Sequence, residues 1–198
     1  MKQTIAVFDF DGTITTGDSF LPLLITCFGW KKTLWKLFLI SPMLILFPLG
    51  IITRQRAKEA TLTKFFRGWT LQDLEKVCQS FAKEKLPEQV KPEALKRIAW
   101  HRSQNHPLIL VSASIDVYLK PWGKEAGFEH VIASLVETAD GKITGKLVGK
   151  NCRCEEKVRR LQEVLGDLSL YEIYAYGDSD GDRELLAAAD HPFYRKLK

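Results

Sequence analysis

The chain has 198 residues, of which 45% are hydrophobic and 27% are charged, so it holds enough apolar material for a folded core and is not intrinsically disordered. Its four cysteines have no spacing typical of a disulfide framework, and its first residues do not resemble a secretory signal peptide, so we expect a cytoplasmic protein. The net charge of +5 is unevenly spread, because residues 19–68 hold eight Lys and Arg against one Glu, whereas the other residues hold 21 basic and 23 acidic side chains. These basic residues flank an apolar run and do not follow a groove, which argues against nucleic-acid binding.

The first element along the chain is a short apolar run over residues 4–8, which predicts a buried β-strand. Residues 19–104 then have a mostly helical pattern. The clearest helix begins after Thr70, which is typical of a helix N-terminus. The apolar positions of this helix fall on one face: Leu71, Leu74, Val77, Cys78 and Phe81. Pro92 suits the first turn of a further helix, which we expect to end near Ser103.

Strands and helices alternate in the remainder of the chain. Apolar runs predict strands at residues 107–112, 130–134 and 171–177. Amphipathic segments predict helices at residues 115–127 and 154–166. Residues 135–148 predict a β-hairpin whose turn is Asp140-Gly141. Because strands that alternate with helices form parallel sheets, we expect an α/β fold with a doubly wound parallel sheet.

Acidic or hydroxyl side chains follow three of the predicted strands. They are Asp9 and Asp11 after the first, Ser112 at the end of the second, and Asp178 and Asp182 after the last. Because the carboxyl ends of parallel strands meet at one edge of a sheet, we expect these groups to converge. Converging carboxylates need a cation, and oxygen ligands of this kind suit Mg²⁺ together with a phosphate group. Lys157, at the start of the helix before the last strand, offers the phosphate a point charge, and Ser112 offers it a hydrogen-bond donor.

Four short motifs resemble, in their order along the chain, those of the haloacid dehalogenase-like (HAD) phosphatases. "DFDGT" resembles the first motif, "VSAS" the second, the lysine of "CEEKVRRL" the third and "GDSDGD" the fourth. The resemblance implies that Asp9 is the nucleophile that attacks phosphorus and forms an aspartyl-phosphate. It also implies that Asp11 is the general acid and base, which protonates the leaving oxygen and then activates water.

The resemblance also assigns ligands to the cofactor and to the phosphoryl group. Mg²⁺ would be held by the Asp9 carboxylate, the Asp11 main-chain carbonyl and Asp178, and Asp182 would support the metal shell. The phosphoryl group would be bound by four residues: Gly12, Ser112, Ala113 and Lys157. Magnesium and phosphate together would compensate the paired aspartates at the end of an apolar strand.

The resemblance further implies a Rossmann-like HAD core, residues 1–17 and 88–198, with a helical cap, residues 18–87, inserted after the first strand. A helical cap at this place is similar to that of the phosphoserine phosphatase-like branch (subfamily IB type). The cap contains residues 37–53, which carry no charge. Two basic clusters flank this run: Lys31, Lys32 and Lys36 on one side, and Arg54, Arg56 and Lys58 on the other.

Three interpretations of the 37–53 run stay open. It forms the core of the cap, as one helix or as two short helices broken at Pro42 and Pro48. Alternatively, it is an interfacial hairpin that dips into one leaflet between basic residues that hold anionic headgroups. A full membrane span is disfavoured, because the run is shorter than the roughly 20 residues required and contains two prolines.

The favoured substrate is a phosphorylated (lyso)phospholipid, because the apolar run and its basic patch resemble the cap of bacterial phosphatidylglycerophosphate phosphatases of the HAD type. One alternative is a soluble metabolite phosphatase of the phosphoserine type, in which Asp18 and either Arg54 or Arg56 would contact the amino acid. Another is a non-catalytic membrane-surface module, which the complete set of motif residues disfavours. We therefore expect a phosphomonoester as partner, no nucleic acid, and a cytoplasmic location, with peripheral association at the inner face of the membrane if the lipid interpretation holds.

Overall fold

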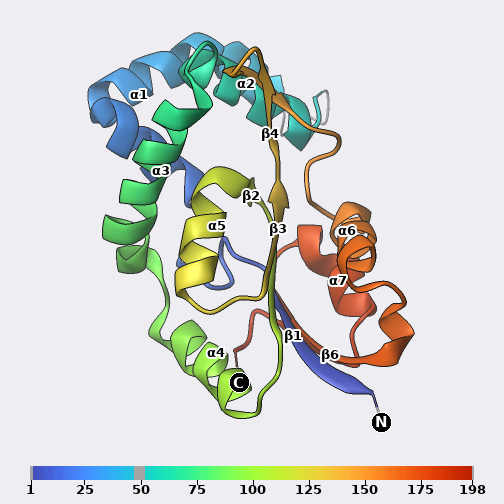
Figure 1. Cartoon of the computed structure of the whole chain (residues 1–198). Helices are drawn as coiled ribbons and strands as arrows, with labels where there is room; N and C mark the ends of the chain where they lie inside the picture. The colour runs from blue at the N-terminus through green and yellow to red at the C-terminus, as the bar shows by residue number, and fades with distance from the viewer. Residues whose placement is uncertain (1, 47–51, 198) are drawn as a thin grey trace.

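The computed structural model describes residues 2–46 and 52–197, and its centre is a five-stranded parallel sheet. The strands are β1 (Gln3–Phe8), β2 (Leu108–Ile115), β3 (His130–Ser134), β6 (Tyr171–Gly177) and β7 (His191–Tyr194). Their order across the sheet is β3-β2-β1-β6-β7, and every neighbouring pair is parallel (Figure 1). The predicted α/β fold with a parallel sheet is confirmed. The order reverses at β1, so the ends of β1 and β6 lie at the position where such sheets bind ligands.

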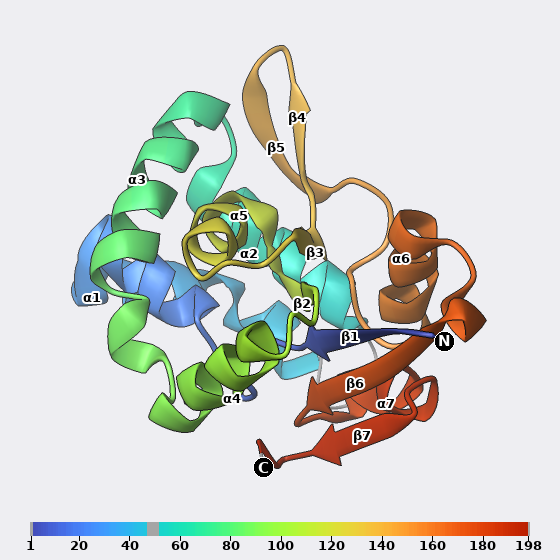
Figure 2. The same cartoon turned by 60° about the horizontal axis from the view of Figure 1, so that its bottom comes forward.

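Helices cover both faces of the sheet. The helices α4 (Pro92–Ser103) and α5 (Asp116–Glu125) lie on one side of the strands, and α6 (Glu155–Leu165) and α7 (Arg183–Ala187) on the other (Figures 1 and 2). Successive side chains of β1 pack on opposite faces of the sheet: Ala6 and Phe8 belong to one buried cluster, and Ile5 and Val7 belong to the other. Three short 3₁₀ helices complete these connections: Pro87–Gln89, Leu168–Leu170 and Asp180–Asp182.

Three further helices lie together beyond one end of the sheet (Figure 1). They are α1 (Phe20–Leu46), α2 (Arg54–Phe66) and α3 (Leu71–Glu84). As predicted, Thr70 is the N-cap of α3, where its hydroxyl accepts a hydrogen bond from the Asp73 N–H at 3.1 Å. The apolar face of α3 is buried at Leu74, Cys78 and Phe81.

The break in α1 lies at Gly29, which has φ 72° and ψ 158°. A glycine adopts this backbone conformation without the steric cost that a Cβ would add. The helix continues past Pro42 to Leu46, whereas residues 47–51, including Pro48 of the apolar run, lie outside the described residues. Within residues 2–46 and 52–197, no helix has both the length and the apolar character of a membrane span.

The predicted hairpin is present as β4 (Val136–Ala139) and β5 (Lys142–Leu147). Asp140 and Gly141 form its turn, and both have positive φ, at 51° and 72°. The hairpin does not join the central sheet. It packs against α2, where the backbone of Gly145 approaches Thr63 so closely that a Cβ would collide, and Ile143 exchanges backbone hydrogen bonds with residues 68–69. The hairpin therefore connects the sheet with the helices α1–α3.

The strand β7 and the attachment of the hairpin are among the parts of this fold that were not predicted from the sequence. The strand β7 contains Pro192 and has only four residues, so its pattern does not indicate a strand. It lies at the edge of the sheet, where the missing N–H of proline is tolerated. The attachment of the hairpin to α2 depends on a contact between segments about 80 residues apart, which no local pattern encodes.

Candidate active site

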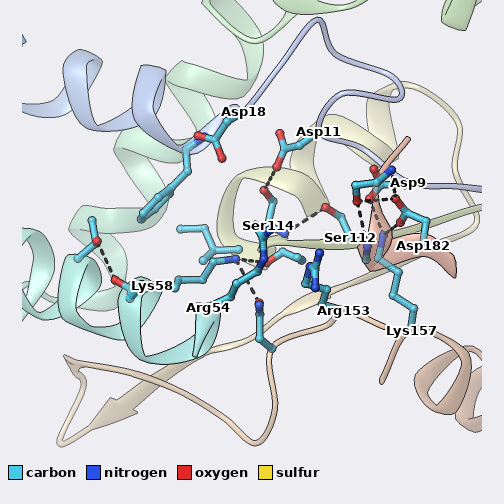
Figure 3. Close-up of a pocket in the computed structure, with 18 residues that line it drawn as sticks. Asp9, Asp11, Asp18, Arg54, Lys58, Ser112, Ser114, Arg153, Lys157 and Asp182 are labelled. Atoms are coloured by element: carbon cyan, nitrogen blue, oxygen red, sulfur yellow. Dashed lines mark hydrogen bonds and ion pairs between the residues drawn. The ribbon is translucent and has the colours of Figure 1, made fainter. Parts of the chain in front are cut away.

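A cavity of about 330 Å³ opens at the carboxyl edge of the sheet, between the strand ends and the helices α1 and α2 (Figure 3). Its core side is lined by residues that the sequence motifs predicted: Asp9, Asp11, Ser112, Ala113, Lys157 and Asp182. Its helical side is lined by six residues of the predicted cap: Asp18, Phe20, Arg54, Ala57, Lys58 and Thr61. The predicted convergence of the motifs is therefore present, and the helices lie directly beside it.

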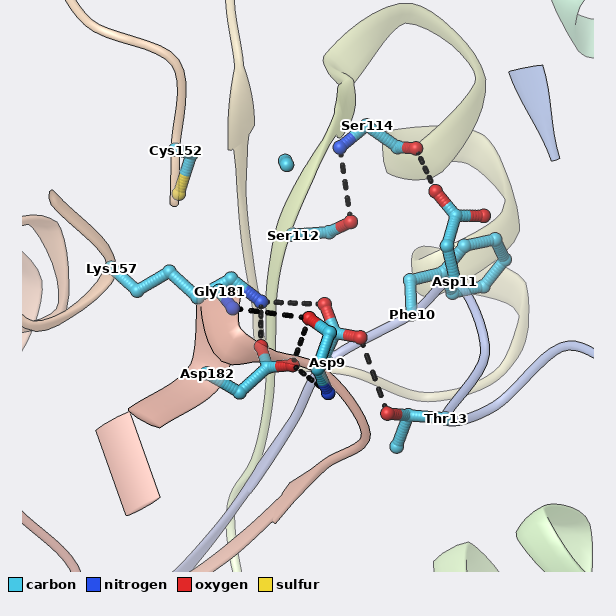
Figure 4. Close-up of polar contacts among 12 residues, drawn as sticks. Asp9, Phe10, Asp11, Thr13, Ser112, Ser114, Cys152, Lys157, Gly181 and Asp182 are labelled. Atoms are coloured by element: carbon cyan, nitrogen blue, oxygen red, sulfur yellow. Dashed lines mark hydrogen bonds and ion pairs between the residues drawn. The ribbon is translucent and has the colours of Figure 1, made fainter. Parts of the chain in front are cut away.

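A buried lysine connects two of the motif aspartates (Figure 4). The Nζ atom of Lys157 lies 2.5 Å from Asp9 Oδ1 and 2.5 Å from Asp182 Oδ1, and all three side chains are buried. Burial alone would lower the pKa of Lys157, but the two carboxylates outweigh it and raise that pKa. The ammonium group therefore stays charged and holds both carboxylates in fixed positions.

Asp182 is fully engaged by protein groups. One carboxylate oxygen accepts from Lys157, and the other accepts from the N–H of Asp178 at 3.3 Å and from the N–H and hydroxyl of Ser179 at 3.0 and 2.9 Å. Although burial raises the pKa of a carboxyl group, these partners keep the pKa of Asp182 below its usual value. Asp182 thus orients the turn that carries Asp178 and has no oxygen left without a partner.

Asp9 and Asp178 face each other across Thr13. The Thr13 hydroxyl lies 3.2 Å from Asp9 Oδ2 and 3.5 Å from Asp178 Oδ1. Gly12, with φ 78°, permits this approach, because a Cβ there would collide with the Asp178 carboxylate. Gly12 therefore has a steric role beside the metal-ligand candidates. Of the two predicted phosphate ligands Gly12 and Ala113, Ala113 lines the cavity of Figure 3. Gly12 does not, and it lines a neighbouring cavity together with Asp178.

The carboxylates of this cluster fit a divalent cation. Oxygen atoms of Asp9, Asp178 and Asp182 all lie within 4.8 Å of one another. Counted with the Lys157 ammonium that pairs with two of them, these three carboxylates leave two negative charges in excess when all are ionised, although Lys91 and Arg195 also favour the charged form of Asp178. Burial is the main cause that raises the pKa of Asp9 to about 7, and the nearby carboxylates of Asp182 and Asp11 also raise it, whereas Lys157 lowers it. A hard cation with oxygen ligands would relieve this excess, and the oxygens of Asp9 and Asp178 have fewer protein partners than those of Asp182.

Asp11 is not part of this cluster, and two serines bind its carboxylate. One of its oxygens accepts from the Ser19 N–H at 2.9 Å and from the Ser19 hydroxyl at 2.5 Å, and the other accepts from the Ser114 hydroxyl. Burial, together with the nearby Asp18, raises the pKa of Asp11. A raised pKa keeps the carboxyl group protonated to higher pH, which suits a group that donates a proton to a leaving oxygen.

Ser112 and its neighbours lie in the C-terminal part of β2, where the pairing with β3 is interrupted between Val111 and Ile115. The Ser112 hydroxyl accepts from the Ser114 N–H at 3.1 Å and lines the cavity, as expected for a phosphate ligand. Ser114, Thr13 and Ser19 were not predicted as site residues. Ser114 lies in the motif "VSAS" and Thr13 in the motif "DFDGT", so their places within these motifs could have indicated that they belong to the site.

The predicted cap residues have different environments. Asp18 lines the cavity, but one of its carboxylate oxygens caps α1 by accepting from the N–H groups of Phe20 and Leu21, each at 3.0 Å. Arg54 and Arg56 are both exposed, but of the two Arg54 lines the cavity and Arg56 does not. Lys58 and Arg153 also line the cavity, and sequence analysis did not select either as a site residue.

Comparisons with known proteins agree with this geometry. A model of haloacid dehalogenase-like hydrolases matches residues 6–187. Protein CicA of Caulobacter vibrioides is 36% identical over 196 residues, which cover 98% of this chain and 86% of that protein. A solved structure of a protein with unknown function from Bordetella pertussis has a TM-score of 0.83 at 23% identity and covers 95% of this chain and 87% of its own.

A phosphoserine phosphohydrolase-like protein from Francisella tularensis has a TM-score of 0.68 at 16% identity, with 97% of this chain and 86% of that chain covered. At these identities the two solved structures support the fold, and the family match and the Caulobacter relative support the membership. The four motifs that carry the resemblance lie at the edge of the sheet where the cavity opens. The chain therefore belongs to the haloacid dehalogenase-like hydrolase family, and it is a phosphatase of that family.

Proposed function

We propose that this phosphatase hydrolyses phosphomonoesters with Mg²⁺ through an aspartyl-phosphate on Asp9. The observation that carries the proposal is the buried cluster in which Asp9 lies between Lys157 and Thr13, at the rim of a cavity that also contains Ser112 and Asp11. This cluster combines a nucleophile, a fixed positive charge and a separate acid, which are the groups that phosphoryl transfer requires.

The reaction follows from the positions of these groups. A carboxylate oxygen of Asp9 attacks phosphorus, the bond from phosphorus to the leaving oxygen breaks, and Asp11 gives that oxygen its proton. Lys157 and Ser112 neutralise and orient the phosphoryl oxygens. Asp11, now ionised, takes a proton from water, whose oxygen attacks phosphorus and releases phosphate from Asp9.

The cofactor would be held by the Asp9 carboxylate, the Asp178 carboxylate and the Asp11 main-chain carbonyl, and Asp182 would support this shell. Bound there, Mg²⁺ would supply charge neutralisation for the phosphoryl group. The charge excess of the cluster supports this assignment, since one divalent cation balances it.

We also propose that residues 1–17 and 88–198 act as the catalytic core and that residues 18–87 act as a substrate-selecting cap. The division of the cavity lining supports this assignment. The core contributes the carboxylates, the serines and Lys157, whereas α1 and α2 contribute an aromatic ring at Phe20 and two basic side chains at Arg54 and Lys58.

The exposed surface of α1 supports a phosphorylated lipid, such as a phosphatidylglycerophosphate-type ester, as the favoured substrate. The five residues of this surface, which we term the α1 apolar face, are between 47% and 66% exposed: Trp30, Leu34, Trp35, Phe38 and Leu39. Lys31 and Lys32 are exposed on the same helix. Exposed tryptophans beside lysines suit the boundary between anionic headgroups and acyl chains, so the cap would associate peripherally with the inner face of the membrane.

A soluble ester of the phosphoserine type is the second candidate. It is favoured by the presence of Asp18 and Arg54 on the helical side of the cavity. It is weakened by the helix-capping role of Asp18, which occupies one carboxylate oxygen that would otherwise bind an amino group. A non-catalytic role is disfavoured, because every motif residue that the chemistry requires is present.

Phosphate release with Mg²⁺ tests the proposal. The experiment compares four substrates: phosphatidylglycerophosphate in detergent micelles, lysophosphatidate, phosphoserine and an aryl phosphate. In a second step, EDTA is added to remove the metal, and an excess of Mg²⁺ is then supplied. The proposal predicts that EDTA abolishes release, that Mg²⁺ restores it, and that the lipids have the highest kcat/KM. A clear preference for phosphoserine would overturn the lipid assignment, and release that persists in EDTA would overturn the metal assignment.

A further inference from the structure

The helical side of the cavity carries positive charge that the phosphoryl chemistry does not use. Three basic side chains line the cavity besides Lys157: Arg54 and Lys58 on the helical side, and Arg153 on the core side. Lys157, on the core side, already serves the phosphoryl group through Asp9. The only acid on the helical side among the described lining residues is Asp18, which caps α1. The contacts of Lys58 and Arg153 show what a second anionic group could bind.

Lys58 extends from α2 to the C-terminal part of β2. Its ammonium donates to the main-chain carbonyl of Ala113 and, at 3.2 Å, to Asn151 Oδ1. Both acceptors are neutral, and within the described part of the chain no carboxylate oxygen lies within ion-pair distance of this ammonium. An ammonium has three N–H donors, so one donor remains for a ligand. Burial lowers the pKa of Lys58 to about 8, although the more distant carboxylates of Asp11 and Asp18 favour its charged form.

Arg153 is fixed on the opposite, core side of the cavity. Its guanidinium lies against the backbone of Gly181, where a Cβ would come within 2.7 Å of Nε. One terminal nitrogen lies 3.3 Å from the Cys154 sulfur, and no ion pair is formed with a carboxylate of the described residues. The planar guanidinium is therefore held at the edge of the site with donors that suit a phosphate or carboxylate group.

We propose that Lys58 and Arg153 form a subsite for a second anionic group, a phosphodiester or a carboxylate, carried by the leaving group of the substrate. The subsite rests on the proposed phosphatase function. It lies close to the phosphoryl site, because Lys58 binds the carbonyl of Ala113, the residue after Ser112. The cavity volume of about 330 Å³ is at the low end for small-molecule sites, so a short headgroup fits it and acyl chains would remain outside.

Lys58 belongs to the helical part and Arg153 to the sheet part, so a second anion would bridge the two. Each contact would pair a half-buried cation, which has only neutral partners, with an anion in a charge-assisted hydrogen bond. A substrate with only one anionic group would gain none of this, and the subsite would select esters by charge. A lipid headgroup and a soluble metabolite both supply such a group, and the test below separates them.

The test compares kcat/KM for three soluble esters: glycerol 3-phosphate, 3-phosphoglycerate, which adds a carboxylate, and the deacylated headgroup of phosphatidylglycerophosphate, which adds a phosphodiester. Lys58→Met and Arg153→Met should each lower kcat/KM for a two-anion ester about tenfold more than that for glycerol 3-phosphate. Lys58→Arg should restore most of the ratio. Lys64→Met, which removes an exposed lysine of α2, should leave the ratio unchanged.

The ester that shows the larger effect identifies the phosphodiester or the carboxylate as the second anion. Equal losses for one-anion and two-anion esters, or no loss, would overturn the subsite. If no ester is hydrolysed, the phosphatase proposal fails, and binding still tests the subsite. Calorimetry with glycerophosphoglycerol and with glycerate should then show weaker binding to Lys58→Met than to Lys64→Met, and identical affinities, or no binding to either, would overturn it.

Discussion

The two sides of the cavity are built in opposite ways. On the core side, the buried charges of Asp9, Lys157 and Asp182 pair with one another. On the helical side, Lys58 donates only to neutral acceptors, and α1 carries the exposed α1 apolar face. The difference indicates that the ion pairs of the sheet edge form before a substrate binds, whereas the ammonium of Lys58 keeps a donor for a ligand. It supports our proposal that residues 1–17 and 88–198 carry the chemistry and that residues 18–87 contribute to substrate choice.

The largest effect is expected from Asp9→Asn on the core side. The amide cannot act as the nucleophile, so phosphate release should fall by at least about 10⁴-fold, comparable to the removal of a nucleophile in other enzymes. Steady-state phosphate release measures the change, and circular dichroism of the variant shows that it is folded. A variant that keeps more than a few per cent of the activity would contradict the role of Asp9.

Lys157→Met tests whether the core side depends on its buried ion pairs. Loss of the ammonium leaves the carboxylates of Asp9 and Asp182 buried without their cation, and we expect the free energy of unfolding to fall by about 3–5 kcal/mol. Urea unfolding in EDTA measures it. The control is Lys120→Met, which removes an ion pair to Asp116 whose lysine is exposed, and which should cost about 0.5 kcal/mol or less. Similar losses for both variants would contradict the account.

The double substitution Trp35→Ser with Phe38→Ser tests the helical side at its surface. These two side chains are 63% and 66% exposed, so their removal should leave folding intact and weaken binding to phosphatidylglycerol vesicles by about tenfold or more. Vesicle sedimentation at low and high salt measures the binding. Leu95→Ser, on α4, removes an exposed apolar residue elsewhere and should have no effect. Equal binding by both variants would contradict a membrane role for the α1 apolar face.

The smallest effect is a pH dependence of substrate selection through Lys58. Its pKa is lowered to about 8, mainly by burial, although Asp11, Asp18 and Cys152 favour the charged form and Lys157 opposes it. A lowered lysine pKa means that the charge is present below about pH 8 and is lost above it.

The preference for two-anion esters over glycerol 3-phosphate should therefore decline several-fold between about pH 7 and about pH 9. The kcat/KM ratio of the two esters, measured across this range, reports the decline. In Lys58→Arg the ratio should be nearly flat, because a guanidinium stays charged at these pH values. A decline of equal size in both proteins would assign it to another group.

The core side could be predicted because local patterns determine it. A buried strand that ends in Asp9 and Asp11, and another that ends in Asp178, must bring these residues to the same edge of a parallel sheet. The positions of Ser112 and Lys157 followed in the same way from the ends of a strand and a helix. Thr13 and Ser114 were missed because a hydroxyl inside a motif does not reveal which carboxylate it will contact.

The helical side could not be predicted to the same depth. The contact of Lys58 with Ala113 joins residues 55 positions apart and depends on how α2 packs, which hydrophobic periodicity does not determine. The break at Gly29 was missed because a glycine within an apolar helical pattern can also be helical. Arg54 and Arg56 were equivalent in sequence, and only the orientation of α2 separates the one that lines the cavity from the one that does not.

The most direct test of the central claim is to trap the phosphoenzyme. The protein is mixed with Mg²⁺ and a cleavable phosphomonoester, quenched in acid within the first turnover, digested and analysed by mass spectrometry. The account predicts that the peptide containing Asp9 gains one phosphoryl group, which mild base removes, and that Asp9→Asn shows none. Turnover with no phosphorylated peptide, or phosphate found on a residue other than Asp9, would contradict it.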